Sequence, residues 1–299
     1  MLVLDFFTTV YEPLRLISAS EHCRYQYGRN IKLLSEVIGR AAALADLTDD
    51  NLARVVAVLL KRGRSPATAN KTFSQLRALW ELAAKRGLVG TYPTMRKIPE
   101  YKRVPVAWNR QQLAALFSAL RTTQGRIAGL RASEWWLALH CLLWNTGLRI
   151  GTALKLRWSD VDWQAGEVIA RAEIQKQRAD QRFRLHPDTM AILTLIRRQE
   201  GEIFPWPQSR ASLWDAYDRI LRRADLPHDR RSKFHRMRRS VASWFEAAGG
   251  DACSLLGHSS RKVTEAYLDD SIVPRPHACD RLWRPWLDSP HDHRPPRGE

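Results

Sequence analysis

Long apolar runs are absent from the sequence, and none approaches the roughly 20 residues that a membrane-spanning helix needs. The N-terminus has neither a basic segment nor a cleavable apolar core, so nothing marks it for export. Cysteine is scarce too: the four residues form no C-x-x-C pair, which excludes the usual zinc modules. His277 and Cys279 alone are too few ligands for a metal. We therefore expect a cytoplasmic protein with no membrane partner, no metal and no cofactor.

Acidic residues are also in short supply. The chain has 31 Asp and Glu against 48 Lys and Arg, which gives a formal net charge of +17. The excess is spread along the chain: residues 1–100 hold 15 basic and 9 acidic residues, and residues 101–299 hold the remaining 33 and 22. A charge of this sign attracts polyanions, above all nucleic acid. A basic, merely solvated surface would have the same composition.

Length and periodicity predict two domains and a mainly helical fold. A chain of 299 residues, 44% of them hydrophobic, can bury two cores. Residues 65–87 show the helical pattern most clearly: Ser65 is a capping residue, Pro66 suits the first helical position, and Gly87 suits the end. Four apolar residues repeat at helical spacing between these ends: Phe73, Leu76, Trp80 and Ala83. We expect residues 1–98 to form a helical domain.

The opposite face of this helix carries Asn70, Ser74 and Arg77, with Lys71 alongside. A stripe of this kind is most often simply solvated. On a basic protein it is also a candidate DNA-binding surface, because amide and cationic side chains can reach base edges and phosphates.

A linker and a second domain follow. Residues 99–107 are rich in proline and basic residues and have little periodicity, which predicts an interdomain linker. The second domain is predicted over residues 108–288, with Asn109 capping its first helix and Gly147 ending the next. Residues 289–299 have the composition of a disordered tail.

Two short alternating runs, residues 166–174 and 182–187, predict a β-hairpin around the polar connection 175–181. Helices resume after Pro187. The predicted fold class is therefore mainly α with a small β-sheet, an α+β arrangement.

Several polar residues of the second domain stand at positions where chemistry is possible. His235 and Arg238 are three residues apart, hence on one face of a helix. Taken singly, each candidate has an ordinary structural explanation, but their order along the chain is hard to produce by chance. The set comprises Arg149, Lys176, His235, Arg238, His258 and Tyr267.

The segments that carry these residues resemble the tyrosine recombinase (phage integrase) family. The specific parts are "TGLRIGTALKLRWSDVD", "HRMRRSVASWFEAAG" and "LGHSSRKVTEAYLD", and the helical first hundred residues are a weaker match to the core-binding domain of that family. The resemblance implies a two-domain DNA clamp that breaks and rejoins DNA strands without metal, associated with a bacterial nucleoid. It also implies the site residues: the nucleophile Tyr267, the arginines Arg149 and Arg238, the histidines His235 and His258, and the hairpin lysine Lys176.

The chemistry calls for these residue types. A tyrosine can attack phosphorus and hold the 3′ phosphate covalently, which preserves the bond energy for religation. Its hydroxyl needs a proton acceptor, for which His235 is the candidate. Guanidiniums grip phosphate oxygens with two hydrogen bonds each, and a histidine can donate a further one. Lys176 can lose a proton and so suits the role of general acid, which leaves Arg178 and Arg182 as predicted contacts to the DNA backbone.

Two departures from the family pattern concern Arg149 and His258. The family usually has an acidic residue three positions after its first arginine, and this chain has Thr152. Support for Arg149 is therefore expected to be neutral. The connection before His258 is also a few residues shorter than usual.

Three other functions are compatible with parts of the sequence. A DNA-binding regulator on the same scaffold, without turnover, explains the charge equally well. A metal nuclease would use Glu265, Asp269 and Asp270, and activity in EDTA would exclude it. A type IB topoisomerase would share much of the chemistry, although a separate helical N-terminal domain favours recombination.

Recombination of two DNA partners needs four active sites, so we expect a tetramer on paired double-stranded DNA sites and a monomer or weak oligomer without DNA. The segment 280–287 offers apolar residues for exchange between neighbours. Truncation after Ile272 would then weaken pairing of sites more than binding to one site.

Overall fold

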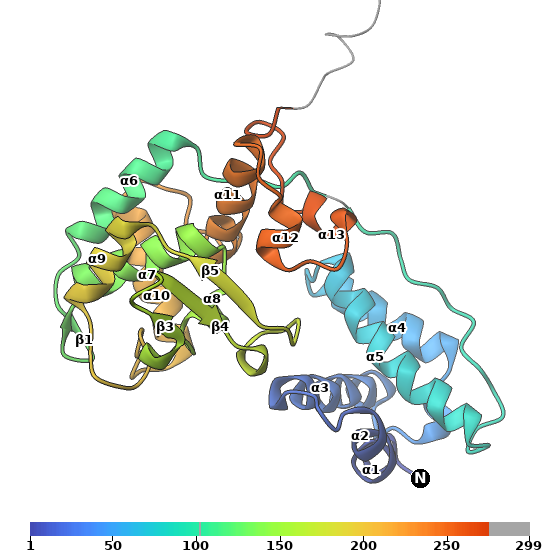
Figure 1. Ribbon diagram of the computed structural model, residues 1–299. Helices are drawn as coiled ribbons and strands as arrows, with labels where there is room; N and C mark the ends of the chain where they lie inside the picture. The colour runs from blue at the N-terminus through green and yellow to red at the C-terminus, as the bar shows by residue number, and fades with distance from the viewer. Residues whose placement is uncertain (102, 275–299) are drawn as a thin grey trace, which may run out of the picture. The chain divides into compact units, whose positions relative to one another are not determined.

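The computed structural model describes residues 1–101 and 103–274, and its contacts divide the chain into two compact units, Met1–Arg103 and Val104–Glu299 (Figure 1). The division falls inside the segment 99–107 that the sequence suggested as a linker. In the described ranges no helix is long and apolar enough to cross a membrane.

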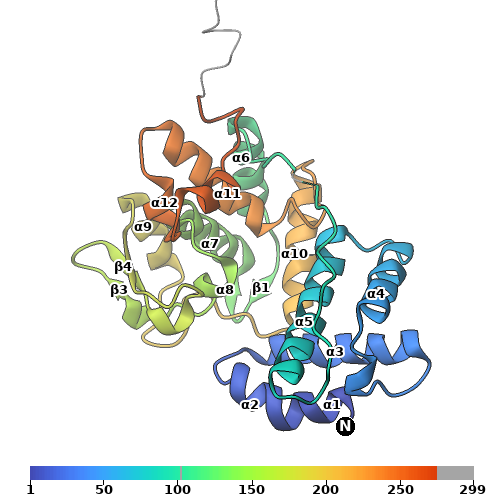
Figure 2. The same cartoon turned by 90° about the vertical axis from the view of Figure 1, so that its right-hand side faces the viewer.

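The first unit is helical. Its elements are α1 (Val3–Phe6), a π-helical turn (Phe7–Tyr11), α2 (Glu12–Arg15), α3 (Glu21–Ile38), a 3-10 turn (Leu44–Asp46), α4 (Asp49–Lys61) and α5 (Pro66–Lys85). The predicted start of α5 is confirmed, since the Ser65 hydroxyl accepts a hydrogen bond from the Thr68 N–H and Pro66 is the first helical residue. All four apolar residues of its predicted stripe are buried, and α5 contacts α3 and α4. Figure 2 shows α4 beside α5.

The chain after α5 returns along the helices of the first unit, and Asn70 holds it there. The Asn70 amide donates to the Ile98 carbonyl at 2.8 Å and to Glu100 at 2.6 Å, and its oxygen accepts from the Ile98 N–H at 3.0 Å. Only 3% of Asn70 is exposed. The expectation that Asn70 lies on an open polar stripe is therefore wrong, because its amide satisfies the backbone of the returning segment.

The second unit packs its helices around α7. The helices are α6 (Arg110–Arg121), α7 (Ala132–Thr146), α8 (Ile150–Ala153), α9 (Pro187–Leu195), α10 (Arg210–Arg223), α11 (Phe234–Ala247), α12 (Ala252–Leu256) and α13 (Arg261–Glu265). Helix α7 is apolar on all sides and contacts α6, α9 and α11, so it forms the centre of the core. Asn109 caps α6 as predicted, with Gln112 completing a capping box.

The small sheet carries the polar connection that the sequence singled out. Strands β3 (Val161–Asp162), β4 (Glu167–Ala170) and β5 (Gln181–Arg184) pair antiparallel in that order, with β4 and β5 forming the predicted hairpin. The first strand is shorter than predicted, because residues 172–174 form a 3-10 turn. The Gln175 amide fixes this turn by donating to the carbonyls of Ala170 and Ala179. A separate two-stranded ribbon, β1 (Arg126–Ile127) with β2 (Leu130–Arg131), was not predicted.

Candidate active site

A cavity of 380 Å³ in the second unit brings together four of the predicted residues. Arg149 precedes α8, Lys176 lies in the connection between β4 and β5, and His235 and Arg238 project from the first turns of α11. These elements are separated by many residues in sequence, and they converge because α7, α8 and α11 share one core.

Arg238 is the most firmly held of the four. Its side chain is buried, with 4% exposed, and its guanidinium donates to the Gly147 carbonyl at 2.5 Å and to the Leu256 carbonyl at 2.9 Å. Burial, together with the charge of Arg149, lowers the pKa of Arg238 to about 10. The group still carries its positive charge at neutral pH. Two backbone carbonyls therefore hold the Arg238 guanidinium in a fixed position in the cavity.

The Gly147 turn makes this arrangement possible. Gly147 ends α7, as predicted, with a φ of +60°, a conformation that residues with a side chain rarely adopt. A Cβ at this position would lie 2.9 Å from the Leu256 side chain. The absence of a side chain thus lets the Gly147 and Leu256 backbones approach the same guanidinium.

Tyr267 lies beside the two histidines. Its ring centroid is 5.0 Å from that of His235 and 4.9 Å from that of His258, and the Arg238 guanidinium carbon is 5.7 Å from the Tyr267 ring. Tyr267 follows the short helix α13, which packs on α12, while α12 packs on α11 (Figure 1). The structure therefore brings the candidate nucleophile, both histidines and the buried arginine into one cluster.

The hydrogen bonds of His258 define its tautomer. Its Nε2 lies 3.3 Å from an Arg238 nitrogen, and its Nδ1 lies 3.0 Å from the Thr264 hydroxyl. An arginine nitrogen can only donate, so Nε2 accepts and the proton is on Nδ1, which donates to Thr264. Burial and the charges of Arg238 and Arg149 lower the pKa of His258 to about 4. His258 is therefore neutral and orients Arg238.

His235 is also neutral at physiological pH. Partial desolvation comes first among the causes, followed by the charges of Arg239, Arg238 and Arg149, and together they lower the pKa of His235 to about 4. The His235 side chain is nevertheless exposed to solvent. A neutral imidazole has a lone pair that can accept a proton, and the His235 ring lies 5.0 Å from the Tyr267 ring, measured between centroids.

Arg149 has a neutral partner, although not at the position that the sequence suggested. One of its nitrogens donates to the Gln177 side-chain oxygen at 2.8 Å. Thr152 does not hold Arg149, because its hydroxyl donates to the Ile174 carbonyl at 3.3 Å. Gln177 could not be assigned from the sequence, since only the turn between β4 and β5 brings it to Arg149.

The other predicted DNA-binding residues lie outside this cavity. Arg182 is exposed and pairs with Glu167 at 2.9 Å, and Arg178 is exposed in the hairpin connection. In the first unit, Lys71 is exposed and Arg77 pairs with Glu81 at 2.8 Å.

Of the acidic residues considered for a metal site, Asp269 serves the fold. The Asp269 carboxylate is buried and accepts hydrogen bonds from the Ala107 N–H at 2.7 Å and from Ser271. It thereby ties the segment after Tyr267 to the segment before α6. Nowhere in residues 1–101 and 103–274 do three His, Cys, Asp or Glu side chains gather as a metal would require. The suggested pair His277 and Cys279 lies outside the described residues.

The structure adds residues that no motif indicated. Arg210 and Trp214, at the start of α10, line the same cavity as Arg149 and Lys176. Their spacing of four residues places them on one helical face, which is the only signal that the sequence offers.

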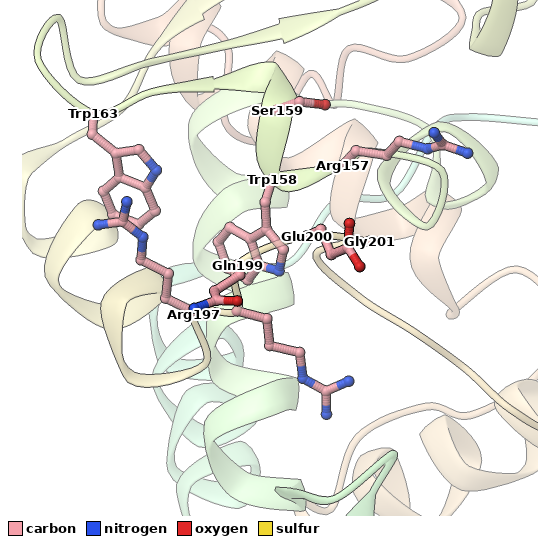
Figure 3. A pocket seen from close by; sticks show the side chains of 9 residues that line it. Arg157, Trp158, Ser159, Trp163, Arg197, Gln199, Glu200 and Gly201 are labelled. Carbon is pink, nitrogen blue, oxygen red and sulfur yellow. The ribbon is translucent and has the colours of Figure 1, made fainter.

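A larger cavity of 870 Å³ lies elsewhere in the second unit and shares no lining residue with this site. Its side chains include Trp158, Trp163, Arg157 and Arg197. Arg157 and Arg197 point in opposite directions (Figure 3), and the Arg197 guanidinium lies 4.1 Å from the centre of the Trp163 ring. The arginines of this larger cavity do not converge on one point where a phosphate could bind. A large volume therefore does not make it the better candidate site.

Comparisons with known proteins agree with this geometry. The family model described as the phage integrase family matches residues 109–272. Prophage integrase IntF of Escherichia coli (strain K12) is 25% identical over 247 residues, which cover 75% of this chain and 50% of IntF. The chain thus spans about half the length of that relative. Tyrosine recombinase XerC of Xanthomonas campestris pv. campestris (strain B100) is 26% identical over 268 residues, 83% of this chain and 78% of XerC.

Solved structures share the fold at lower identity. A lambda integrase dimer bound to a COC′ core site gives a TM-score of 0.70 at 19% identity, covering 95% of this chain and 98% of the other. The Tn1549 transposon integrase in complex with circular intermediate DNA gives a TM-score of 0.73 at 14% identity, covering 94% of this chain and 97% of the other.

Proposed function

The chain belongs to the phage integrase family of tyrosine recombinases, and from this premise we propose that it is a site-specific DNA recombinase that cuts and rejoins strands through a covalent 3′-phosphotyrosine. The observation that carries the proposal is the position of Tyr267, within 5.0 Å of two neutral histidine rings and next to the buried Arg238. A tyrosine that only packed would not need this surrounding of cations and proton acceptors.

In the cleavage step, the Tyr267 oxygen forms a bond to phosphorus while the bond from phosphorus to the 5′ oxygen breaks. His235 accepts the tyrosine proton, and its neutral state at pH 7 supports that role. Lys176 donates a proton to the departing 5′ oxygen. Religation reverses these steps with the 5′ hydroxyl of the partner strand, so no bond energy is lost. The balance of protons needs no metal.

Arg149 and Arg238 stabilise the charge that develops on the phosphate oxygens. Arg238 is fixed before substrate binds, because Gly147 and Leu256 hold it, so little reorganisation is needed in the transition state. For His258 we propose the role that its tautomer supports, which is to hold the Arg238 guanidinium. Direct donation to the phosphate would require its proton to move from Nδ1 to Nε2.

The test is Tyr267→Phe, which removes one hydroxyl and keeps the ring. We expect DNA binding to persist and the covalent adduct, trapped by denaturation and separated on a gel, to disappear. Adduct formation at the wild-type level would eliminate Tyr267 as the nucleophile. Other tyrosines of the chain are poor replacements: Tyr217 is fully buried, and Tyr92 and Tyr101 belong to the first unit. DNA binding by the wild type without any adduct would favour the regulator without turnover.

Double-stranded DNA is the proposed partner of both units. For the assembled state we propose a tetramer on two paired sites, because exchange between two duplexes requires four strand cuts. The fold is shared with a lambda integrase tetramer bound to a Holliday junction, at a TM-score of 0.65 and 18% identity. Sedimentation of the protein with a duplex carrying two sites would show four subunits per pair of sites, whereas a complex of two would contradict the proposal.

A further inference from the structure

The catalytic cavity does not end at the residues of the family motifs. On one side it is bounded by Arg210, the first residue of α10, and by Trp214 one turn later. Arg210 also lines a second cavity of 260 Å³, together with Lys155 and Gly151. The two cavities therefore share Arg210 and Gly151, and Arg210 stands between them.

The Arg210 side chain lies close to Gly151, which has no side chain of its own. A Cβ added to Gly151 would lie 3.5 Å from a terminal nitrogen of Arg210. Gly151 comes two residues after Arg149, so the Arg210 guanidinium lies over the start of α8, beside the segment that presents Arg149 to the phosphate.

The two cationic side chains that line this second cavity make no ion pair among the described residues. Arg210 and Lys155 are exposed, and neither side chain has a hydrogen-bond or ion-pair partner in the part of the chain that the structure describes. Glu202 is the acidic residue among those that line the cavity, and it leaves an excess of one positive charge. The neighbouring catalytic cavity is also cationic, so a continuous basic path runs from Lys176 and Arg149 to Arg210 and Lys155.

A DNA strand offers anions at a spacing that fits such a path. Each strand carries one phosphate per about 3.4 Å of helix axis, so a phosphate held by Arg149 and Arg238 has charged neighbours immediately on both sides. A free guanidinium next to the first phosphate site is therefore placed to bind the adjacent one with two hydrogen bonds.

We propose that Arg210, assisted by Lys155, binds the backbone phosphate adjacent to the scissile phosphate on the strand that is cut. The inference rests on the proposed recombinase function and adds a residue to its substrate contacts. Arg210 fixes the register of the strand in the site, so that the phosphorus lies in line with the Tyr267 oxygen.

A neutral phosphate analogue tests this directly. The cleavage site is first located from the wild-type adduct, and each phosphate flanking it is then replaced in turn by an uncharged methylphosphonate. Arg210→Ala is compared with Arg219→Ala, which removes the same charge from the same helix. Arg219 is exposed and lies nine residues later, about 180° around α10.

We expect Arg210→Ala to cleave unmodified DNA roughly 10-fold or more slowly, and Arg219→Ala to cleave it at the wild-type rate. One adjacent methylphosphonate should slow the wild type and Arg219→Ala by a similar factor, yet change Arg210→Ala little, because its partner is already missing. Arg210→Lys should recover part of the rate. Equal slowing of wild type and Arg210→Ala by every analogue would overturn the assignment.

Binding gives a second readout that does not require cleavage. For a duplex of arbitrary sequence, Arg210→Ala should lower the slope of log Kd against log salt by about 1, the value for one lost phosphate contact. Arg219→Ala should leave the slope unchanged. Absence of adduct with the wild type would defeat the recombinase proposal, whereas an unchanged slope for Arg210→Ala would defeat this one.

Discussion

At the scale of single residues, the site depends on how its cations are held. Arg238 is buried and fixed by two carbonyls and His258, whereas Arg149 has one neutral partner and Lys176 is exposed. A fixed guanidinium stabilises charge without reorganisation. An exposed lysine without a fixed partner position is better suited to deliver a proton to a departing group.

The roles of acid and charge stabiliser can be separated with a sulfur substrate. An alkoxide leaves poorly without a proton, so Lys176→Ala should cleave an ordinary phosphodiester roughly 10²-fold or more slowly. With sulfur at the bridging 5′ position the leaving group is a thiolate, which needs no acid, and cleavage by Lys176→Ala should recover.

Tyr267→Phe should remain inactive on the sulfur substrate, and Arg149→Ala should recover little, because neither the nucleophile nor the charge stabiliser is replaced. The measurement is the rate of adduct formation on both substrates. Rescue of all three variants, or of none, would remove the general-acid role from Lys176.

The buried residue His140 of α7 should make the free energy of unfolding depend on pH. His140 is fully buried, its Nδ1–H donates to the Trp136 carbonyl, and its Nε2 has no partner among the described residues. Burial lowers the pKa of His140 from 6.5 to about 4. Between pH 4 and pH 6.5, His140 binds a proton in the unfolded chain but not in the folded chain. Stability should therefore fall as pH falls from about 6.5 to 4, by up to about 1.4 kcal/mol per pH unit.

His140→Phe should make this dependence shallower, because it removes the titrating group and keeps an aromatic ring among Trp136, Tyr217 and Phe234. Urea unfolding at several pH values measures this dependence, with the exposed His22→Phe as the control. Parallel curves for the wild type and His140→Phe would contradict the assignment.

At the scale of secondary-structure elements, helix ends and connections supply the hydrogen-bond partners that hold distant side chains and segments in place. The end of α7 at Gly147 supplies a carbonyl to Arg238, and the turn between β4 and β5 supplies Gln177 to Arg149. In the first unit, α5 supplies Asn70 to the segment that returns along it. In each case a polar group on one element forms a hydrogen bond with a polar group that is distant in sequence.

Asn70→Ala should destabilise the first unit by about 1–3 kcal/mol, because it leaves the Ile98 N–H and C=O without their partner. The neighbouring exposed residue is a matched control, and Lys71→Ala should change the free energy of unfolding by at most about 0.5 kcal/mol. Chemical denaturation measures both. A DNA-binding loss in Lys71→Ala without loss of stability would support the proposed contact, whereas equal stability of the two variants would refute the structural role of Asn70.

At the scale of the whole molecule, the net charge of +17 dominates the interaction with a polyanion. A surface that neutralises several phosphates releases the counterions of those phosphates on binding. We expect affinity for duplex DNA of arbitrary sequence to fall by roughly 10³-fold or more between 50 and 200 mM salt. Titrations at four salt concentrations measure the slope, and a weak dependence would mean that the excess charge is only a solvated surface.

Much of the fold could be predicted from local pattern. Ser65 and Pro66 at the start of α5, Asn109 at the start of α6 and Gly147 at the end of α7 are confirmed, because caps and left-handed turns depend on residues close in sequence. The two strands of the hairpin are confirmed, but both end earlier than predicted. The side chain of Gln175 fixes the turn that follows β4, and β5 ends at Arg184, before α9 begins at Pro187.

The types and order of the proposed catalytic residues, from Arg149 to Tyr267, can be read from the sequence alone, because chemistry restricts which side chains can act on a phosphate. The surroundings of these residues depend on the packing of the whole domain. Arg238 meets a carbonyl 91 residues earlier in the chain, and Asp269 meets an N–H 162 residues away. Such contacts follow from packing of whole helices, which no local pattern encodes. For the same reason only the structure shows that Asn70 is buried and that Arg210 lines the candidate active-site cavity.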